Sequence, residues 1–79
     1  MFDSILVVCV GNICRSPTGE RLLKQALPMK KVASAGLGAL VGKPADGMAT
    51  EVASEHDLSL EGHKAQQLTS ALCRQYDLI

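Results

Sequence analysis

The apolar residues near the start of the chain form a solid run rather than an alternating pattern. Residues 5–10 are all apolar and mostly β-branched, a composition and length typical of a strand buried on both faces within a parallel sheet. Gly11 and Asn12, which both tolerate a left-handed backbone, end this strand. Residues 32–35 predict a second strand, which Gly36 ends.

A helical pattern separates these two strands. Its apolar stripe recurs at helical spacing and consists of Leu22, Leu23, Ala26 and Leu27. Ser16 is a favoured N-cap residue, and Pro17 suits the first helical position because its missing N–H would be unpaired there. We therefore predict a helix from Pro17 to about Leu27, which Pro28 ends. A strand, a helix and a second strand in so short a stretch predict a βαβ unit with parallel strands.

The second half of the chain predicts two further helices and mostly irregular structure between them. After a glycine-containing loop over residues 36–44, Asp46 is placed to cap a helix that reaches about His56. The apolar residues expected on its inward face are Met48, Ala49, Val52 and Ala53. Residues 58–67 predict irregular structure, and Thr69 predicts the cap of a short third helix.

Residues 76–79 predict the opening of a third strand. The whole pattern predicts a single α/β domain over residues 1–79, with three α/β/α layers around a parallel sheet. Because the chain stops as that strand begins, we expect it to be the N-terminal part of a longer domain, truncated after the start of the third strand.

Composition narrows the possible partners. Eight Lys and Arg residues balance eight Asp and Glu residues, so nothing in the net charge indicates a broad nucleic-acid surface. The apolar run at residues 5–10 is too short for a signal-peptide core or a membrane span, and we expect a cytoplasmic protein without membrane insertion. Three cysteines are an odd number, which argues against a disulfide framework and directs attention to thiol chemistry.

One segment between the first strand and the first helix carries candidate chemistry: Cys9-Val10-Gly11-Asn12-Ile13-Cys14-Arg15-Ser16-Pro17. The start of a helix offers unpaired N–H groups and the positive end of the helix dipole, which together favour an anion. Small residues allow the preceding loop to turn further N–H groups inward as a nest. Arg15 can bind two oxygens of a phosphate-like dianion with its planar guanidinium. The segment therefore predicts an anion site.

Cys9 lies at the end of the strand and faces this predicted site. An ordinary thiol has a pKa near roughly 8.5, so only a few per cent is thiolate at neutral pH. The helix dipole, the nest and Arg15 all favour the charged form. We therefore expect Cys9 to be a nucleophile with a lowered pKa, directed at the bound anion. A Cys-x-x-Cys metal hook is absent, and we expect no metal site.

The segment from Val8 to Pro17 resembles the signature loop of low-molecular-weight protein-tyrosine phosphatases. The resemblance extends over nearly the whole chain, through Glu20, Ser34-Ala35-Gly36, Gly62-His63-Lys64-Ala65 and Tyr76-Asp77-Leu78-Ile79. It implies the phosphotyrosine phosphatase I-like fold and a hydrolase that acts without a metal or organic cofactor. It implies as substrate a phosphotyrosine-containing protein, with bacterial tyrosine autokinases of exopolysaccharide production as one such partner.

The resemblance also implies a role for each residue of the loop, residues 9–16. Cys9 would attack phosphorus, Arg15 would bind the equatorial oxygens, and Ser16 would donate to the Cys9 thiolate. Asn12 would hold the strained loop, and Cys14 would form a reversible disulfide with Cys9 under oxidation. The implied substrate-binding residues, whose backbone N–H groups line the cradle, are Val10, Gly11, Asn12, Ile13 and Cys14.

Two departures from the family pattern leave alternatives open. Gly19 stands where many relatives carry Ala, a tolerable change, but no Asp precedes Pro, so the Asp-Pro general acid of the family is absent from these residues. A thiol-dependent arsenate reductase resembles the same fold and loop, yet it needs two further redox cysteines and only Cys73 lies downstream. A non-catalytic phosphate-binding module is the other alternative.

For His63, we expect hydrogen bonding within a loop rather than catalysis.

Overall fold

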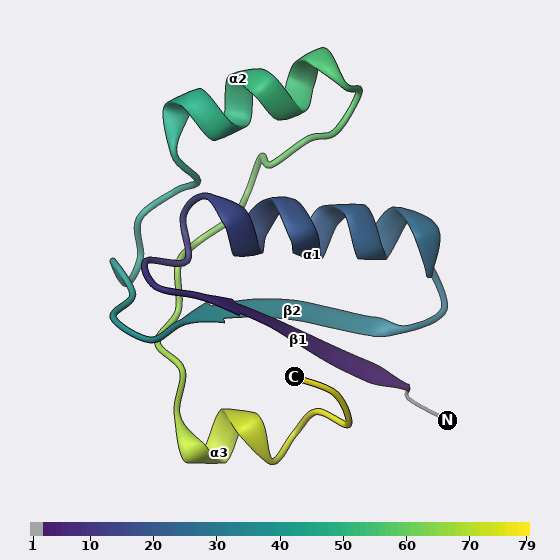
Figure 1. Ribbon diagram of the computed structural model, residues 1–79, viewed down its shortest axis with the longest axis vertical. Coiled ribbons are helices and arrows are strands. Elements are labelled where there is room, and N and C mark those ends of the chain that lie inside the picture. The colour runs from purple at the N-terminus through teal and green to yellow at the C-terminus, as the bar shows by residue number, and fades with distance from the viewer. Residues whose placement is uncertain (1–2) are drawn as a thin grey trace.

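The computed structural model describes residues 3–79 and has a βαβ unit at its centre (Figure 1). Strand β1 spans Ser4–Cys9, helix α1 spans Arg15–Ala26 and strand β2 spans Lys31–Gly36. The strands pair in parallel, in a register that runs from Ser4 opposite Lys31 to Cys9 opposite Gly36. The predicted parallel βαβ unit is therefore confirmed, and it brings the end of β1 and the start of α1 together.

The prediction that β1 is buried on both faces is wrong for these residues. Leu6 is 1% exposed, but Ile5 and Val7 on the opposite face are only half-buried. That face carries Val7 of β1 and Ser34 of β2, and Ser34 reaches α1 by a hydrogen bond to Glu20. Because α1 is the one long helix over this two-stranded sheet, it covers only part of the face.

The predicted start of α1 also needs correction. The helix begins at Arg15, its N-cap is Cys14, and Ser16 lies inside the first turn. Ser16 is 1% exposed, and its hydroxyl contacts Cys9 and Asn12 instead of capping the helix. Ser16, which helix propensity predicts to be a cap, therefore belongs to the hydrogen-bond network around Cys9. The other end of α1, at Ala26, agrees with the prediction to within one residue.

Helix α2, Gly47–Glu55, is capped as predicted, because the Asp46 carboxylate accepts a hydrogen bond of 3.1 Å from the Ala49 N–H. Its inward face was only half correctly predicted. Met48 and Val52 are 72% and 47% exposed. The residues that pack are Ala49 and Ala53, four positions apart, against a small cluster with Leu58 and Leu60. Small alanines bring α2 close to the irregular segment at residues 57–62.

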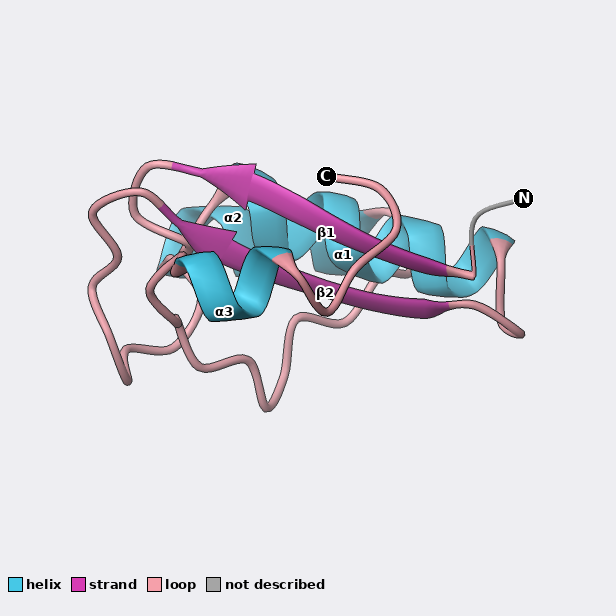
Figure 2. Cartoon of the chain, turned by 90° about the horizontal axis from the view of Figure 1, so that it is seen from below, coloured by secondary structure: helices cyan, strands magenta, loops and turns pink. Residues whose placement is uncertain are grey.

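The C-terminal residues lie on the other side of the sheet from α1 (Figure 2). Thr69 caps the short helix α3, Ser70–Cys73, as predicted. Leu78 then forms a parallel bridge with Ile5 and accepts a hydrogen bond of 2.8 Å from the Leu6 N–H. The predicted opening of a third strand is therefore confirmed, and it lies beside β1. The predicted three-layer α/β/α architecture is also confirmed. Among the described residues, no helix has the length and apolarity to cross a bilayer.

Candidate active site

The loop between β1 and α1 encloses a hollow of about 280 Å³ at the carboxyl end of the sheet. Its lining residues are Cys9, Val10, Gly11, Ile13, Cys14 and Arg15. Parallel sheets bind ligands at this end because strand ends and helix starts converge there. The structure therefore gathers the predicted thiol and the predicted guanidinium around one small hollow.

The Cys9 thiol receives several hydrogen bonds from the loop. Its Sγ lies 2.8 Å from the Ser16 hydroxyl oxygen and accepts from the Asn12 N–H at 3.3 Å. Burial is the largest single influence on the pKa of Cys9, and it opposes ionisation. The Ser16 hydroxyl and the backbone N–H groups of Ser16, Asn12 and Gly11 outweigh it, so the pKa of this thiol lies below its ordinary value.

Asn12 organises the loop from a fully buried position. Its φ of +58° is in the left-handed region, which Asn tolerates better than most residues. Its Oδ1 accepts from the Gln66 N–H at 2.8 Å, and its Nδ2 donates to the Ser16 hydroxyl oxygen at 2.8 Å. Since a backbone N–H can only donate, Gln66 determines which end of the Asn12 amide faces Ser16.

This chain of contacts also favours one direction for the Ser16 proton. The Asn12 amide nitrogen donates to the Ser16 oxygen, so the hydroxyl hydrogen is left to point along the 2.8 Å contact to Cys9. A hydroxyl that donates to sulfur stabilises a thiolate more than a thiol. The arrangement therefore favours a charged sulfur over a neutral thiol.

Two residues from distant parts of the chain complete the loop. His63 is 7% exposed, and its Nε2 lies 2.6 Å from the Asn12 carbonyl oxygen, which is the loop hydrogen bond expected for it. Gly36, opposite Cys9 in the sheet, passes so close that a Cβ there would lie 2.4 Å from the Val10 carbonyl oxygen. Both residues support the loop from outside the hollow.

Arg15 and Cys14 lie at the solvent side of the hollow. Both are exposed, and Arg15 makes no ion pair within residues 3–79. Cys14 is a free, exposed thiol and is not packed under the helix. Among the described residues, no group of three or more His, Cys, Asp or Glu side chains is arranged to hold a metal ion.

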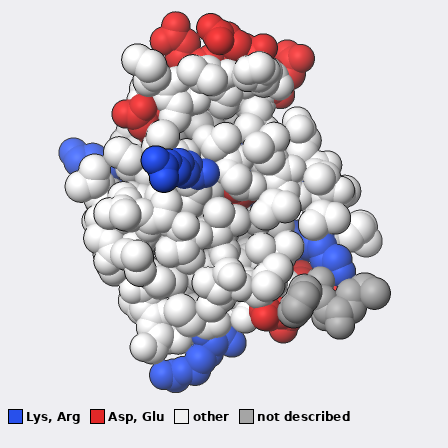
Figure 3. All heavy atoms as spheres, in the orientation of Figure 1, with Lys and Arg blue, Asp and Glu red and all other residues white. Residues whose placement is uncertain are grey.

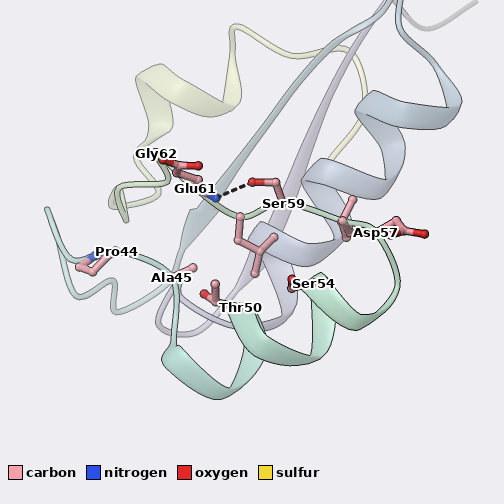
Figure 4. Close-up of a pocket in the computed structure, with 10 residues that line it drawn as sticks. Pro44, Ala45, Thr50, Ser54, Asp57, Ser59, Glu61 and Gly62 are labelled. Carbon is pink, nitrogen blue, oxygen red and sulfur yellow. Dashed lines mark hydrogen bonds between the residues drawn. The ribbon is translucent and has the colours of Figure 1, made fainter.

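A larger hollow of about 640 Å³ lies between α2 and the segment at residues 57–62 (Figure 4). Its lining includes the carboxylates of Asp57 and Glu61 but no Lys, Arg or Cys. Acidic side chains also gather over α2 in Figure 3, where Glu51 and Glu55 are exposed. The negative charge at this end of the molecule is less suited to a phosphate-like anion than the loop around Cys9.

Residues 4–79 match the family described as low molecular weight phosphotyrosine protein phosphatase. The chain belongs to this family. It is 70% identical over 79 residues to the low molecular weight protein-tyrosine-phosphatase Wzb of Salmonella typhi, covering 100% of this chain and 53% of that protein. The chain therefore spans about half the length of the curated relatives it matches.

Solved structures of relatives superpose closely on this phosphatase-family chain. The crystal structure of the Erwinia amylovora tyrosine phosphatase AmsI has a TM-score of 0.98 and 67% identity, covering 100% of this chain and 52% of the other. Vibrio vulnificus Wzb in complex with benzylphosphonate has a TM-score of 0.96 and 62% identity, covering 100% of this chain and 57% of the other. The phosphotyrosine phosphatase I-like fold predicted for the chain is thus confirmed.

The sequence did not identify every residue that supports the phosphatase-family loop. Gln66 contributes a backbone N–H, which no side-chain pattern predicts, and its contact spans 54 positions along the chain. The sequence indicates Gly36 as the end of a strand and as part of the family resemblance, but not as the point where the backbone approaches the loop. A glycine at the end of the strand that pairs with Cys9 is the sequence feature that hints at such a contact.

Proposed function

We propose that the protein hydrolyses phosphotyrosine in a protein substrate through a phosphocysteine on Cys9. The observation that carries the proposal is the Cys9 sulfur, which accepts from the Asn12 N–H and lies 2.8 Å from the Ser16 hydroxyl beside a helix start. The implied phosphate-binding loop is residues 9–16. Family membership and the names of the relatives support this reaction class.

In the first step, the Cys9 thiolate attacks phosphorus, an S–P bond forms and the P–O bond to the tyrosyl oxygen breaks. The negative charge on the phosphoryl oxygens grows on the outer side of the hollow, where Arg15 is exposed and has no acidic partner within residues 3–79. A bidentate guanidinium contact matches two of these oxygens. We assign Arg15 this role, and the inward N–H groups of Val10 to Cys14 the remaining contacts.

The tyrosyl oxygen needs a proton as it leaves. The family resemblance implies an Asp of an Asp-Pro pair as the donor, and the Asp residues of this chain, none followed by Pro, are Asp3, Asp46, Asp57 and Asp77. A general acid typically contributes about 10²- to 10⁴-fold to the rate. We therefore assign the nucleophile to Cys9 and the phosphate clamp to Arg15, and we assign the proton donor to none of these four Asp residues.

In the second step, water attacks the phosphorus of the phosphocysteine, a P–O bond forms, the S–P bond breaks, and inorganic phosphate is released with the protons of the water. The sulfur leaves as a thiolate, and the Ser16 hydroxyl donates to it along the 2.8 Å contact. The Asn12 amide keeps the Ser16 proton turned toward Cys9 in both steps. One hydrogen-bond chain thus serves both the attacking and the leaving thiolate.

We propose a phosphotyrosine-containing protein as the partner, with a tyrosine autokinase linked to exopolysaccharide production as the candidate, in the cytoplasm. The names of the Wzb and AmsI relatives support a protein-phosphotyrosine substrate. The apolar mouth of the hollow fits an aryl phosphate better than a sugar phosphate, because exposed Val10 lines it.

The test is the pH profile of alkylation of Cys9 by iodoacetamide, with and without vanadate. We expect a half-maximal rate well below about pH 8.5 and protection by vanadate. Arg15→Lys keeps the charge but loses the planar fork, so it should lose vanadate protection while leaving the alkylation profile nearly unchanged. An ordinary thiol profile without vanadate protection would refute the proposal.

A further inference from the structure

The side chain of Gln67 holds the turn that follows β2. Its Oε1 accepts from the Ala39 N–H at 3.0 Å, and its Nε2 donates to the Leu37 carbonyl oxygen at 2.8 Å and to the Leu68 carbonyl oxygen at 3.3 Å. The exposed side-chain amide of Gln67 therefore binds both a backbone N–H and a backbone carbonyl within residues 37–39. A contact of this kind restricts the backbone of the turn more than a single hydrogen bond does.

The backbone of Gln67 is held independently of its side chain. Gln67 forms a parallel bridge with Gly36, whose N–H donates to the Gln66 carbonyl at 2.9 Å and whose carbonyl accepts from the Leu68 N–H at 2.8 Å. Removing the Gln67 amide therefore removes its two contacts to the turn at residues 37–39 but leaves the segment that supports Asn12 in place. This separation makes the role of the amide testable.

The turn that Gln67 holds runs beside the phosphate-binding loop. The N–H groups of Leu37, Gly38 and Leu40 donate to three successive carbonyls, those of Cys9, Val10 and Gly11, at 2.9, 2.9 and 3.1 Å. Leu37 and Leu40 are 64% and 51% exposed, and Val10 on the loop itself is 70% exposed. We call Val10, Leu37 and Leu40 the apolar rim.

Single exposed apolar residues are common on protein surfaces. The apolar rim differs because hydrogen bonds tie the turn that carries Leu37 and Leu40 to the loop that carries Val10, beside the hollow of Cys9. An aryl group attached to a phosphate in that hollow emerges where exposed Val10 lines it. Covering exposed apolar side chains with a ring is favourable in proportion to the area removed from water.

We propose that Gln67 is a positioning residue for substrate selection, which holds the apolar rim in place against the aryl group of the substrate. This inference rests on the proposed phosphatase function and deepens it. Gln67 contacts neither phosphate nor the reacting sulfur, so it acts on the preference for aryl over inorganic phosphate rather than on phosphate binding itself. A loosened rim must be ordered again on binding, which costs affinity.

The test compares the affinities of the protein for inorganic phosphate and for benzylphosphonate, measured by calorimetry. Gln67→Ala should weaken benzylphosphonate binding about threefold to tenfold and leave phosphate binding unchanged. Gln67→Glu keeps an acceptor for the Ala39 N–H but places a carboxylate against the Leu37 carbonyl, so it should not restore the preference. Gln75→Ala is the control, an exposed glutamine whose side chain makes no hydrogen bond within residues 3–79.

Amide hydrogen exchange provides a second measurement. The Ala39 N–H should exchange faster in Gln67→Ala than in Gln75→Ala, whereas the Gly36 N–H should keep its protection. Equal loss of affinity for both anions would overturn the proposal, because it would indicate a purely structural role. An unchanged ratio of benzylphosphonate affinity to phosphate affinity in Gln67→Ala would also overturn the proposal. A protein that binds neither anion before substitution would refute the proposed function, and the inference with it.

Discussion

Replacing Gly36 with alanine tests whether the loop depends on a close backbone approach. A Cβ at this position would lie 2.4 Å from the Val10 carbonyl oxygen, 3.0 Å from the Asn12 nitrogen and 3.1 Å from the Asn12 Cβ. The nearest of these atoms belongs to the backbone and cannot rotate away. Either β2 must move from β1 or the loop must shift outward.

The size of the effect follows from two opposing contributions. Forcing a methyl group into a filled site costs about 1–3 kcal/mol, and contact with backbone places Gly36→Ala at the upper end. Replacing glycine with alanine restricts the unfolded chain, which recovers about 0.4–1 kcal/mol. We therefore expect a net loss of about 2 kcal/mol, which lowers the urea midpoint of unfolding by about 1 M.

The same shift should change the thiol. The Asn12 N–H donates to Cys9, and the Asn12 amide orients Ser16, so displacement of this backbone weakens both contacts to sulfur. Burial then opposes ionisation with less compensation, and the pKa of Cys9 should rise toward its ordinary value. The assay is the pH profile of iodoacetamide alkylation, measured beside urea unfolding followed by circular dichroism.

Gly38→Ala is the matched control, because a Cβ at Gly38 would meet no atom within 4 Å. It should leave the midpoint unchanged or raise it slightly, with an unchanged alkylation profile. If Gly36→Ala and Gly38→Ala unfold at the same urea concentration and alkylate with the same pH profile, the close approach has no energetic consequence and the reasoning is wrong.

Substitutions at three further positions probe other contacts. Asn12→Gly keeps access to the φ of +58° but loses the side-chain amide, so it should raise the pKa of Cys9. Asn12→Ala should also strain the backbone, at a cost of about 1 kcal/mol, and should therefore unfold at a lower urea midpoint than Asn12→Gly. Gly19→Ala should stabilise the protein by less than about 1 kcal/mol in thermal unfolding, because helix propensity improves while a Cβ 3.2 Å from a Val7 methyl carbon needs only a small side-chain adjustment. The pKa of Asp77 is lowered chiefly because its carboxylate accepts a hydrogen bond from the Asp3 N–H. The contribution of Asp77 to stability is therefore present above its ordinary pKa of 3.8 and is lost as the pH falls below that value. The difference in melting temperature between wild type and Asp77→Asn should therefore shrink on acidification.

Local patterns were sufficient for the order of elements and for the placement of Cys9 and Arg15 at one hollow. A solid apolar run, a helical stripe and a second short run predict a βαβ unit, because strand and helix periods are properties of adjacent residues. The proximity of Cys9 and Arg15 could be predicted for the same reason, since a strand end followed at once by a helix start places both at one hollow. Family resemblance along the chain added their roles.

Local patterns misjudged features that depend on distant neighbours. Ser16 has the propensity of a cap, but its hydroxyl contacts Cys9 and Asn12. Met48 and Val52 belong to an apolar stripe, but α2 packs through its alanines because the segment at residues 57–62 approaches on that side. In each case a tertiary contact outweighed a local preference of about 1 kcal/mol or less.

The supports of the loop were decided by the tertiary structure alone. Gln66 and His63 reach Asn12 across 54 and 51 positions, and Gly36 reaches it across the sheet. A backbone N–H donor does not depend on the type of residue that carries it, so the sequence does not indicate such a contact. A close backbone approach is indicated only by a glycine at a position where no larger residue fits. The sequence by itself determines which side chains are available for the proposed chemistry. The tertiary structure decides which hydrogen bonds set the charge of the Cys9 thiol and the direction of its contacts, because those bonds come from segments that only folding brings together.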